Sequence, residues 1–250
     1  MKTNKFLLVS LLLSTFSLSA CDLNGLVSHS GNDNDDESSD VSGNSNSDVS
    51  GNSNSSAGGN SYDDSIFDES ESLEKLIAYG KNTGFEITTK ATAADGTDNE
   101  ITLAMKGNLW WHIDSEGSGS GYRLEDGKCA MLSYDEGIWS VFISNVGETQ
   151  FEAMFESTSN YLYRANSYFA NEGFTFDSNG KYAGRDVLKF KYERSVGPVS
   201  VKHDYYVDKD LGISLYQYAE TTNESEKDWA KLETTSFKTG NDVTPITIAE

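Results

Sequence analysis

Apolar and polar residues alternate with a period of two over much of the chain. Phe85, Ile87 and Thr89 alternate with polar residues, and the pattern resumes at Ile101 after an Asp-Gly turn at residues 95–98. Such alternation is typical of strands with one buried face, and Asp-Gly between two strands favours a tight hairpin. Read along the whole chain, the pattern predicts an antiparallel meander of roughly eleven short strands, separated by turns rich in Gly and Asp.

Two segments break this alternation and have the three- and four-residue spacing of amphipathic helices. The first starts at Asp68, which forms a capping-box pattern with Glu71, and is expected to end at Gly80. The second has apolar residues at helical spacing from Phe151 to Phe169, or about five turns. Because this second helix separates two groups of strands, we expect it to divide the sheet into two halves. The predicted fold class is α+β.

The alternation also assigns side chains to the two faces of the sheet. Leu109, Trp111 and Ile113 are expected to continue the inward face of the first strands, whereas Trp110 and His112 point the other way. Periodicity does not distinguish residues that line a ligand cavity from ordinary core residues, so both interpretations stay open. The candidate lining residues are Leu109, Trp111, Ile113, Tyr122, Leu124, Phe142 and Met154.

The start of the chain is typical of a secretory signal. Lys2 and Lys5 precede an apolar run, and the sequence Leu18-Ser19-Ala20-Cys21 places small residues before a cysteine. This pattern resembles the lipobox of bacterial lipoproteins, which implies cleavage before Cys21 and acylation of that residue. The alternatives are a plain signal peptide and an uncleaved membrane helix, but the apolar run is shorter than the roughly 20 residues that span a bilayer. We expect residues 1–20 to be removed and Cys21 to anchor the protein to a bacterial membrane in the cell envelope.

Residues 21–65 are predicted to be a disordered tether. They consist mainly of Ser, Asn, Gly and Asp, a composition that cannot offset the entropy of ordering. The octapeptide at residues 39–46 recurs unchanged at residues 47–54, which indicates a duplicated spacer. The globular domain is expected at residues 66–250.

The net charge of −21 excludes one class of partner. A chain this acidic repels nucleic acid and an anionic membrane surface. The chain has two cysteines, and acylation of Cys21 leaves Cys129 without a disulfide partner. We expect Cys129 to be a small buried side chain.

Local sequences in the second half of the chain add a family resemblance. Tyr182-Ala183-Gly184-Arg185 opens a strand, and residues 205–212 form a hairpin turn. With the order of strands and helices, these sequences are similar to those of the LolA-like and LprG-like lipid and lipoprotein carriers, over about residues 66–240. The resemblance implies an unclosed half-barrel, in which two helices on the concave side of a curved antiparallel sheet cover an apolar cavity for acyl chains. Arg123 and Arg185 are candidates for the buried arginine of those carriers.

Motifs for catalysis are weak. Residues 72–75 and 238–240 match two short elements of penicillin-recognising enzymes, but the third element occurs only in the tether, and the domain is too small for that fold. The three histidines are too scattered to indicate a metal site or a triad. Asp208 and Asp210 are typical of a tight turn. We expect a protein without enzymatic activity, metal ion or cofactor.

Two functions of different class follow. The first is a membrane-anchored carrier that binds a lipid, an acyl chain or a lipoprotein anchor in the half-barrel by hydrophobic burial. The second is a surface-tethered interaction module, whose core is filled and whose exterior binds a protein or a glycan. The ligand, the membrane leaflet and the oligomeric state are not fixed by the sequence.

Overall fold

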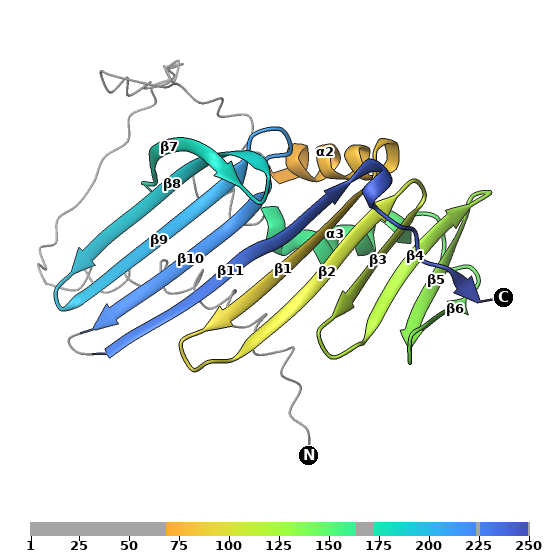
Figure 1. Cartoon of the computed structure of the whole chain (residues 1–250), viewed down its shortest axis with the longest axis horizontal. Coiled ribbons are helices and arrows are strands. Elements are labelled where there is room, and N and C mark those ends of the chain that lie inside the picture. The colour runs from red at the N-terminus through yellow and green to blue at the C-terminus, as the bar shows by residue number, and fades with distance from the viewer. Residues whose placement is uncertain (1–68, 164–172, 224–225, 250) are drawn as a thin grey trace, which may run out of the picture.

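The computed structural model describes residues 69–163, 173–223 and 226–249, which form a curved sheet and two helices on one side of it (Figure 1). The expected signal, the acylated Cys21 and the tether at residues 21–65 lie outside the described residues.

The elements follow the order that the sequence predicts. The first half of the domain consists of α2 (Glu69–Asn82), β1 (Phe85–Ala93), β2 (Asp98–Lys106), β3 (Leu109–Asp114), β4 (Gly119–Glu125), β5 (Lys128–Asp135) and β6 (Ile138–Ile143). After α3 (Gln150–Tyr163), the second half consists of β7 (Thr175–Tyr182), β8 (Arg185–Val196), β9 (Val199–Asp208), β10 (Ser214–Asn223), β11 (Glu226–Thr239), the short 3-10 helix η2 (Gly240–Asp242) and β12 (Ile248–Ala249).

The two halves are meanders that meet in the middle of the sheet. The strand order of the described sheet is β12-β6-β5-β4-β3-β2-β1-β11-β10-β9-β8-β7, so the two halves join where β1 pairs with β11. α3 follows β6 at one end of the sheet, and the chain resumes with β7 at the other end. The predicted α+β class and the unclosed, curved sheet are confirmed. The structure adds a short twelfth strand, β12, which runs parallel to β6.

The first helix does not end at Gly80, as expected, but continues to Asn82. Gly84, with a φ of 87°, makes the turn into β1, and a glycine adopts this conformation without strain. Gly80 is buried against β2 instead. A Cβ at this position would lie 2.5 Å from the Sδ atom of Met105, so the glycine permits close packing of helix on sheet. The predicted N-cap and the predicted last turns of the second helix lie outside the described residues.

The main core lies between the sheet and both helices. Leu76 of α2 and Phe151 and Phe155 of α3 are fully buried there, together with Trp110 of β3. The Trp110 indole contacts Phe155 edge to face, with centroids 5.8 Å apart, and its Nε1 donates to the carbonyl oxygen of Phe151 at 2.9 Å. Each fully buried aromatic side chain stabilises the fold by about 2–3 kcal/mol. These contacts fix α3 on the first half of the sheet.

A second cluster covers the opposite face of β2–β6. It contains Trp111, Trp139 and Val243, and none of its members comes from a described helix. The C-terminal segment after β11 runs across this face (Figure 1). Lys106 holds the segment, because its Nζ donates to the carbonyl oxygens of Gly240 and Val243 at 3.0 and 2.9 Å. Part of the first half of the sheet therefore packs against the main core on one face and against this second cluster on the other.

Val243→Asp should release this segment. The Val243 side chain is 1% exposed, and an unpaired carboxylate at such a position costs about 3 kcal/mol or more. We expect a lower free energy of unfolding, a red-shifted tryptophan emission and stronger acrylamide quenching, because Trp111 and Trp139 become accessible. Thr244→Asp adds the same charge at an exposed neighbouring position and should change none of these quantities. Equal effects of the two substitutions would contradict the packing described for the C-terminal segment.

Candidate functional site

Hydrogen bonds to α3 identify the helix-side face of the second half of the sheet. Gln217 of β10 donates from Nε2 to the carbonyl oxygen of Tyr161 at 2.9 Å, and the hydroxyl of Thr89 of β1 donates to the Tyr161 hydroxyl at 3.5 Å. Burial raises the pKa of Tyr161 to about 12, so the phenol stays neutral. The C-terminal part of α3 therefore lies over β1 and β10, and side chains that share a face with Gln217 and Thr89 point to the helix side.

Two adjacent register rows, the first of which also contains Gln217, form a largely apolar patch. Cross-strand partners point to the same face of a sheet. One row pairs Ala91 with Leu232, and the next joins Ala93, Ala230 and Ala219 across β1, β11 and β10. Leu232 is buried, whereas the alanines are part-exposed. We call Ala91, Ala93, Ala219 and Ala230 the alanine patch. Alanine side chains are short, so this part of the sheet is apolar and its side chains extend only a short distance from the backbone.

An uncharged aromatic cluster borders the alanine patch on β9. His203 is the cross-strand partner of Ala219. Its ring lies among Phe174, Tyr192 and Tyr205, with centroid distances of 6.1, 5.7 and 6.1 Å. Burial lowers the pKa of His203 to about 4, so the imidazole is neutral at pH 7. The patch and this cluster together present an apolar surface without charge.

In the first half of the sheet, the same face becomes polar. His112, Ser120, Ser133 and Ser140 are successive cross-strand partners on β3 to β6, and His112 lies opposite the buried Leu103 of the helix-side core. The Ser120 hydroxyl lies 3.4 Å from Nδ1 of His112, and the hydroxyls of Ser133 and Ser140 are 3.4 Å apart. Burial lowers the pKa of His112. The helix-side face thus carries alanine methyl groups in the second half of the sheet and serine hydroxyl groups in the first half.

The seven candidate lining residues do not share one surface. Tyr122 belongs to the core between sheet and helices, and Leu124 and Met154 pack against that core. Phe142 is 66% exposed on β6. A role of these residues in binding a ligand stays a prediction.

The predicted direction of β3 is wrong. Trp111 belongs to the cluster on the face away from the helices, and Leu109 and Ile113 pack against that cluster, whereas Trp110 faces α3. The reason is that both faces of β3 are buried: Trp110 and Trp111 are 0% and 2% exposed. When both faces are apolar, alternation identifies a strand but not which of its two side-chain sets meets the helices.

Sequence reasoning also missed the alanine patch. Alternation places Ala91 and Ala93 on one face of their strand, but an alanine by itself does not indicate whether that face is buried, exposed or able to bind a ligand. Their proximity to Ala219 and Ala230 depends on the register between β1 and β11, which no local sequence feature specifies.

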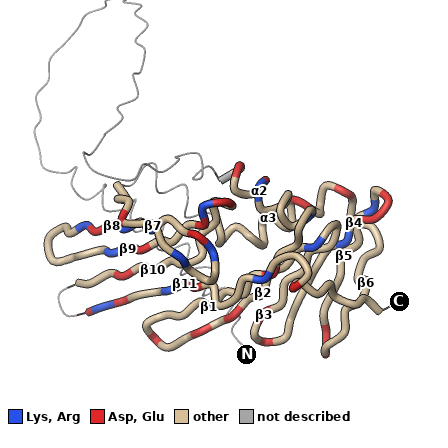
Figure 2. The backbone as a smooth tube through the Cα atoms, turned by 45° about the horizontal axis from the view of Figure 1, so that its top comes forward, with Lys and Arg blue, Asp and Glu red and all other residues tan. Residues whose placement is uncertain are grey.

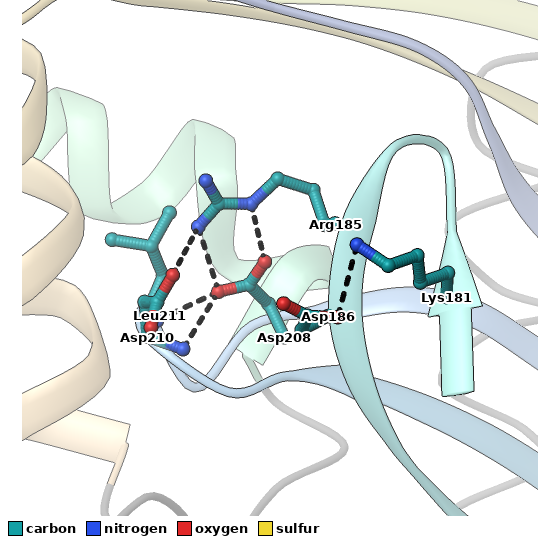
Figure 3. A network of polar contacts seen from close by, with 6 residues as sticks. All are labelled: Lys181, Arg185, Asp186, Asp208, Asp210 and Leu211. Carbon is teal, nitrogen blue, oxygen red and sulfur yellow. Dashed lines mark hydrogen bonds and ion pairs between the residues drawn. The ribbon is translucent and has the colours of Figure 1, made fainter. Parts of the chain in front are cut away.

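Arg185, at the start of β8, binds two aspartates of the turn between β9 and β10 (Figure 3). Its Nε and Nη2 donate to the two carboxylate oxygens of Asp208 at 2.6 and 3.0 Å, and Nη2 also donates to Asp210 at 3.2 Å. Asp208 is fully buried, and its Oδ1 accepts the backbone N–H groups of Asp210 and Leu211. Hydrogen bonding to Asp208 raises the pKa of Arg185. The bidentate pair fixes the shape of the turn.

This network also connects the turn to α2 and β11. The Arg185 guanidinium lies 5.0 Å from the ring centroid of Phe237 and 5.9 Å from that of Tyr79, within range of cation–π attraction. Of the two arginines that the resemblance suggested, the Arg185 side chain is 18% exposed and that of Arg123 is 40% exposed, beside Glu125. Arg185 is therefore the less exposed arginine of the pair, and its partners give it a structural role.

The residues considered for catalysis have ordinary structural partners. Ser72 donates to the carbonyl oxygen of Gly212, and Lys238 pairs with Glu86. Cys129 is buried, which raises the pKa of its thiol. Within the described ranges, no group of three His, Cys, Asp or Glu side chains is arranged to hold a metal ion. None of the helices in those ranges has the length and apolar character to cross a bilayer.

Comparison with known proteins gives distant structural neighbours. No protein-family model and no curated protein matches the chain. The neighbours include MucB in its complex with MucA from Pseudomonas aeruginosa, at 14% identity and a TM-score of 0.31 over 71% of this chain and 58% of that one. The lipoprotein LppX of Mycobacterium tuberculosis matches at 9% identity and a TM-score of 0.34, over 75% of this chain and 100% of its own. A DUF1329 family protein from Desulfovibrio piger matches at 10% identity and a TM-score of 0.25, over 72% and 94%. The chain thus spans less than two thirds of the length of MucB.

Asp208→Asn should destabilise the fold much more than Asp210→Asn. The first substitution breaks a bidentate ion pair with a fully buried partner, which we expect to cost about 2–3 kcal/mol, whereas Asp210 is 78% exposed and its pair is worth at most about 0.5 kcal/mol. Chemical denaturation of both variants measures the difference. Similar decreases in the free energy of unfolding would show that the two aspartates stabilise the fold equally and that Asp208 has no special role.

His203 should make the protein less stable as the pH falls from about 6.5 to about 4. In this range the unfolded chain binds a proton at His203 and the folded protein does not, so protonation favours unfolding, by up to about 3 kcal/mol at the acid end. His203→Phe keeps the aromatic packing and removes this contribution. Urea denaturation of the two proteins at about pH 7.5 and about pH 4.5 tests the expectation. Parallel pH dependences would contradict it.

Proposed function

We propose that this chain is a non-catalytic lipid-binding protein, anchored to a bacterial membrane through Cys21, which shields an acyl chain on the helix-side face of its half-barrel. The observation that carries the proposal is the alanine patch: part-exposed methyl groups in adjacent register rows, beside an uncharged aromatic cluster. An acyl chain needs apolar contact and no specific hydrogen bonds, which is what such a surface offers.

The position of the core supports a site beyond α3 rather than beneath it. Phe151, Phe155 and Leu162 of α3 are fully buried against the sheet, so large side chains already fill that layer. At the alanine patch the sheet carries only methyl groups. Each methylene of a ligand buried there would contribute about 0.8 kcal/mol, so seven or so methylenes offset much of the entropy lost on binding.

The polar row on β3 to β6 suits the other end of a lipid. His112 and the serine hydroxyls beside it offer hydrogen-bond donors and acceptors without a fixed charge. Ester or sugar oxygens of a head group would find partners there. A neutral or weakly charged head group agrees with the acidic character of the chain.

In this proposal, the predicted tether would extend the distance that the domain can cover from the membrane. The residues between Cys21 and α2 would hold the domain, as a flexible coil, about 35–40 Å from the membrane on average. At this distance a carrier collects or delivers a lipid without leaving the cell envelope. Neither the ligand nor the leaflet follows from these features.

A second candidate function has one observation in its favour. Tyr206 and Tyr216 stack with centroids 4.6 Å apart, Tyr182 contacts both, and the Nζ of Lys189 lies 4.7 Å above the Tyr206 ring. Tyr216 precedes Gln217 on β10, so its side chain points to the opposite face of the sheet from Gln217, whereas Tyr182 and Tyr206 also pack against the main core. Part-exposed tyrosines are suited to binding a protein or a glycan.

Native mass spectrometry on the chain from residue 22 onward tests the lipid proposal without the covalent lipid. We expect copurifying or added lipids to appear as adducts of acyl-chain mass. Ala219→Trp fills the space over the patch and should reduce the adducts by about tenfold or more, as a loss of some 1.4 kcal/mol or more in binding requires.

Thr222→Trp is the matched control, because Thr222 lies on the same strand but points to the opposite face, and it should leave the adducts unchanged. A wild-type protein that stays free of adducts after incubation with lipids would exclude the carrier and favour the outer tyrosine cluster. Adducts that survive Ala219→Trp would place the lipid elsewhere on the protein.

A further inference from the structure

One buried hydroxyl group next to the alanine patch has no hydrogen-bond partner. Thr234 of β11 is 4% exposed, and its Oγ1 is without a partner in the described part of the chain. A group of this kind is unfavourable, because it has lost its contact with water and no protein atom replaces that contact. Thr234 therefore indicates a missing partner, which a bound molecule can supply.

Thr234 belongs to a small group of hydroxyls at the C-terminal part of α3. Its cross-strand partner is Thr89 of β1, so both side chains point to the helix side. The Oγ1 of Thr89 lies 3.5 Å from the Tyr161 hydroxyl, which accepts in this contact and keeps its own hydrogen for another acceptor. Tyr161 is only partly buried, so the group lies at the margin of the core. We call Thr89, Tyr161 and Thr234 the hydroxyl cluster.

The hydroxyl cluster lies between the polar row of His112 and the alanine patch. Across β2, His112 belongs to the same register row as Ile87 of β1. Thr89 follows Ile87 by two residues, and Ala91 and Ala93 of the alanine patch follow at further steps of two, each about 7 Å along the strand. The helix-side face thus presents, in this order, a polar row, a pair of hydroxyl donors and an apolar surface.

In the described rows around the hydroxyl cluster, no basic side chain shares its face. The charged residues of β1 and β11 in these rows are Lys90, Lys231 and Glu233, which alternate with the residues of the cluster and so point to the opposite face (Figure 2). α3 contains no lysine or arginine between Gln150 and Tyr163. A carboxylate or phosphate would lose its hydration here without gaining a counter-charge, whereas a neutral carbonyl oxygen needs only hydrogen-bond donors.

We infer that the hydroxyl cluster binds the carbonyl oxygen of an acyl ester, so that the ligand is an esterified lipid rather than a free fatty acid. This assignment rests on the proposed function and names the class of its ligand. Thr234 and Tyr161 donate to the carbonyl oxygen, the acyl chain extends over the alanine patch, and the alcohol part of the ester lies toward the His112 row. Bound in this direction, the ligand also gives Thr234 the partner that it lacks.

Native mass spectrometry on the chain from residue 22 onward tests this inference with two neutral probes. Methyl palmitate carries the carbonyl group, and hexadecyl methyl ether has a methylene in its place. Added as a mixture, the two probes compete for the protein and are distinguished by mass. We expect the wild type to bind the ester about tenfold more tightly, as hydrogen bonds from two hydroxyls allow. Palmitate, which is ionised at neutral pH, should compete less well than the ester.

Thr234→Val keeps the shape of the side chain without its hydroxyl and should reduce the preference for the ester to about threefold, as should Tyr161→Phe. Thr234→Ser keeps a hydroxyl and should keep most of the preference. Because the Thr234 hydroxyl has no described partner, Thr234→Val should resist denaturant at least as well as the wild type. Thr92→Val is the matched control: it removes a hydroxyl from the opposite face of β1 and should leave the preference unchanged.

The possible results separate this inference from the lipid proposal. If the wild type binds ester and ether equally, or if Thr234→Val keeps the wild-type preference, the hydroxyl cluster does not bind the carbonyl, and only this inference is overturned. If palmitate displaces the ester, the restriction to esterified lipids is wrong. If the wild type binds neither neutral probe, the lipid proposal itself fails, and this inference fails with it.

Discussion

The pairing of β1 with β11 is the contact on which the rest of the structure depends. It runs from Phe85 opposite Thr239 to Ala93 opposite Ala230, and it joins strands from the two ends of the domain. Without it, the two meanders would be separate small sheets, each with an exposed edge in place of a centre. A register irregularity after Thr88 places one extra residue in β11, and such bulges increase local twist and bend a sheet. Because the partners are distant in sequence, closing this contact costs more chain entropy than any hairpin in the domain.

The position of α3 determines which part of the helix-side face of the sheet is covered by the core. It is bound to the first half through Trp110 and reaches the second half through Tyr161. Where it lies over the sheet, aromatic and aliphatic side chains are buried between helix and sheet. Beside it, the helix-side face carries the alanine patch and the aromatic cluster of His203 in the second half of the sheet, and a row of serine hydroxyls in the first half. The same helix therefore creates both the core and the surface beside it that we propose for a lipid.

The two ends of the sheet differ in the residues that they expose. β7 carries charged side chains, whereas β6 carries apolar ones. At β7, charges and ion pairs oppose the addition of another strand. At β6, the C-terminal segment covers Trp139 but leaves Phe142 in solvent. The Arg185 network connects the start of β8 with the turn between β9 and β10. One end of the described sheet thus carries ion pairs, and the other carries exposed apolar side chains.

Much of the fold follows from the sequence, because strand alternation and helical spacing are local properties. The order of the strands, the position of the second helix as a divider and the α+β class could all be predicted from residues such as Phe85, Ile87 and Phe151. The face of β3 could not, because Trp110 and Trp111 are both buried and only the positions of α3 and the C-terminal segment decide which indole meets which partner. The alanine patch could not be predicted either, since alanines from three strands come together only through the register of β1 with β11 and of β11 with β10. The sequence by itself thus determined the elements and their order. Tertiary structure alone decided which faces are filled, which stay open and which edge is left unpaired, because these depend on contacts between residues far apart in the chain.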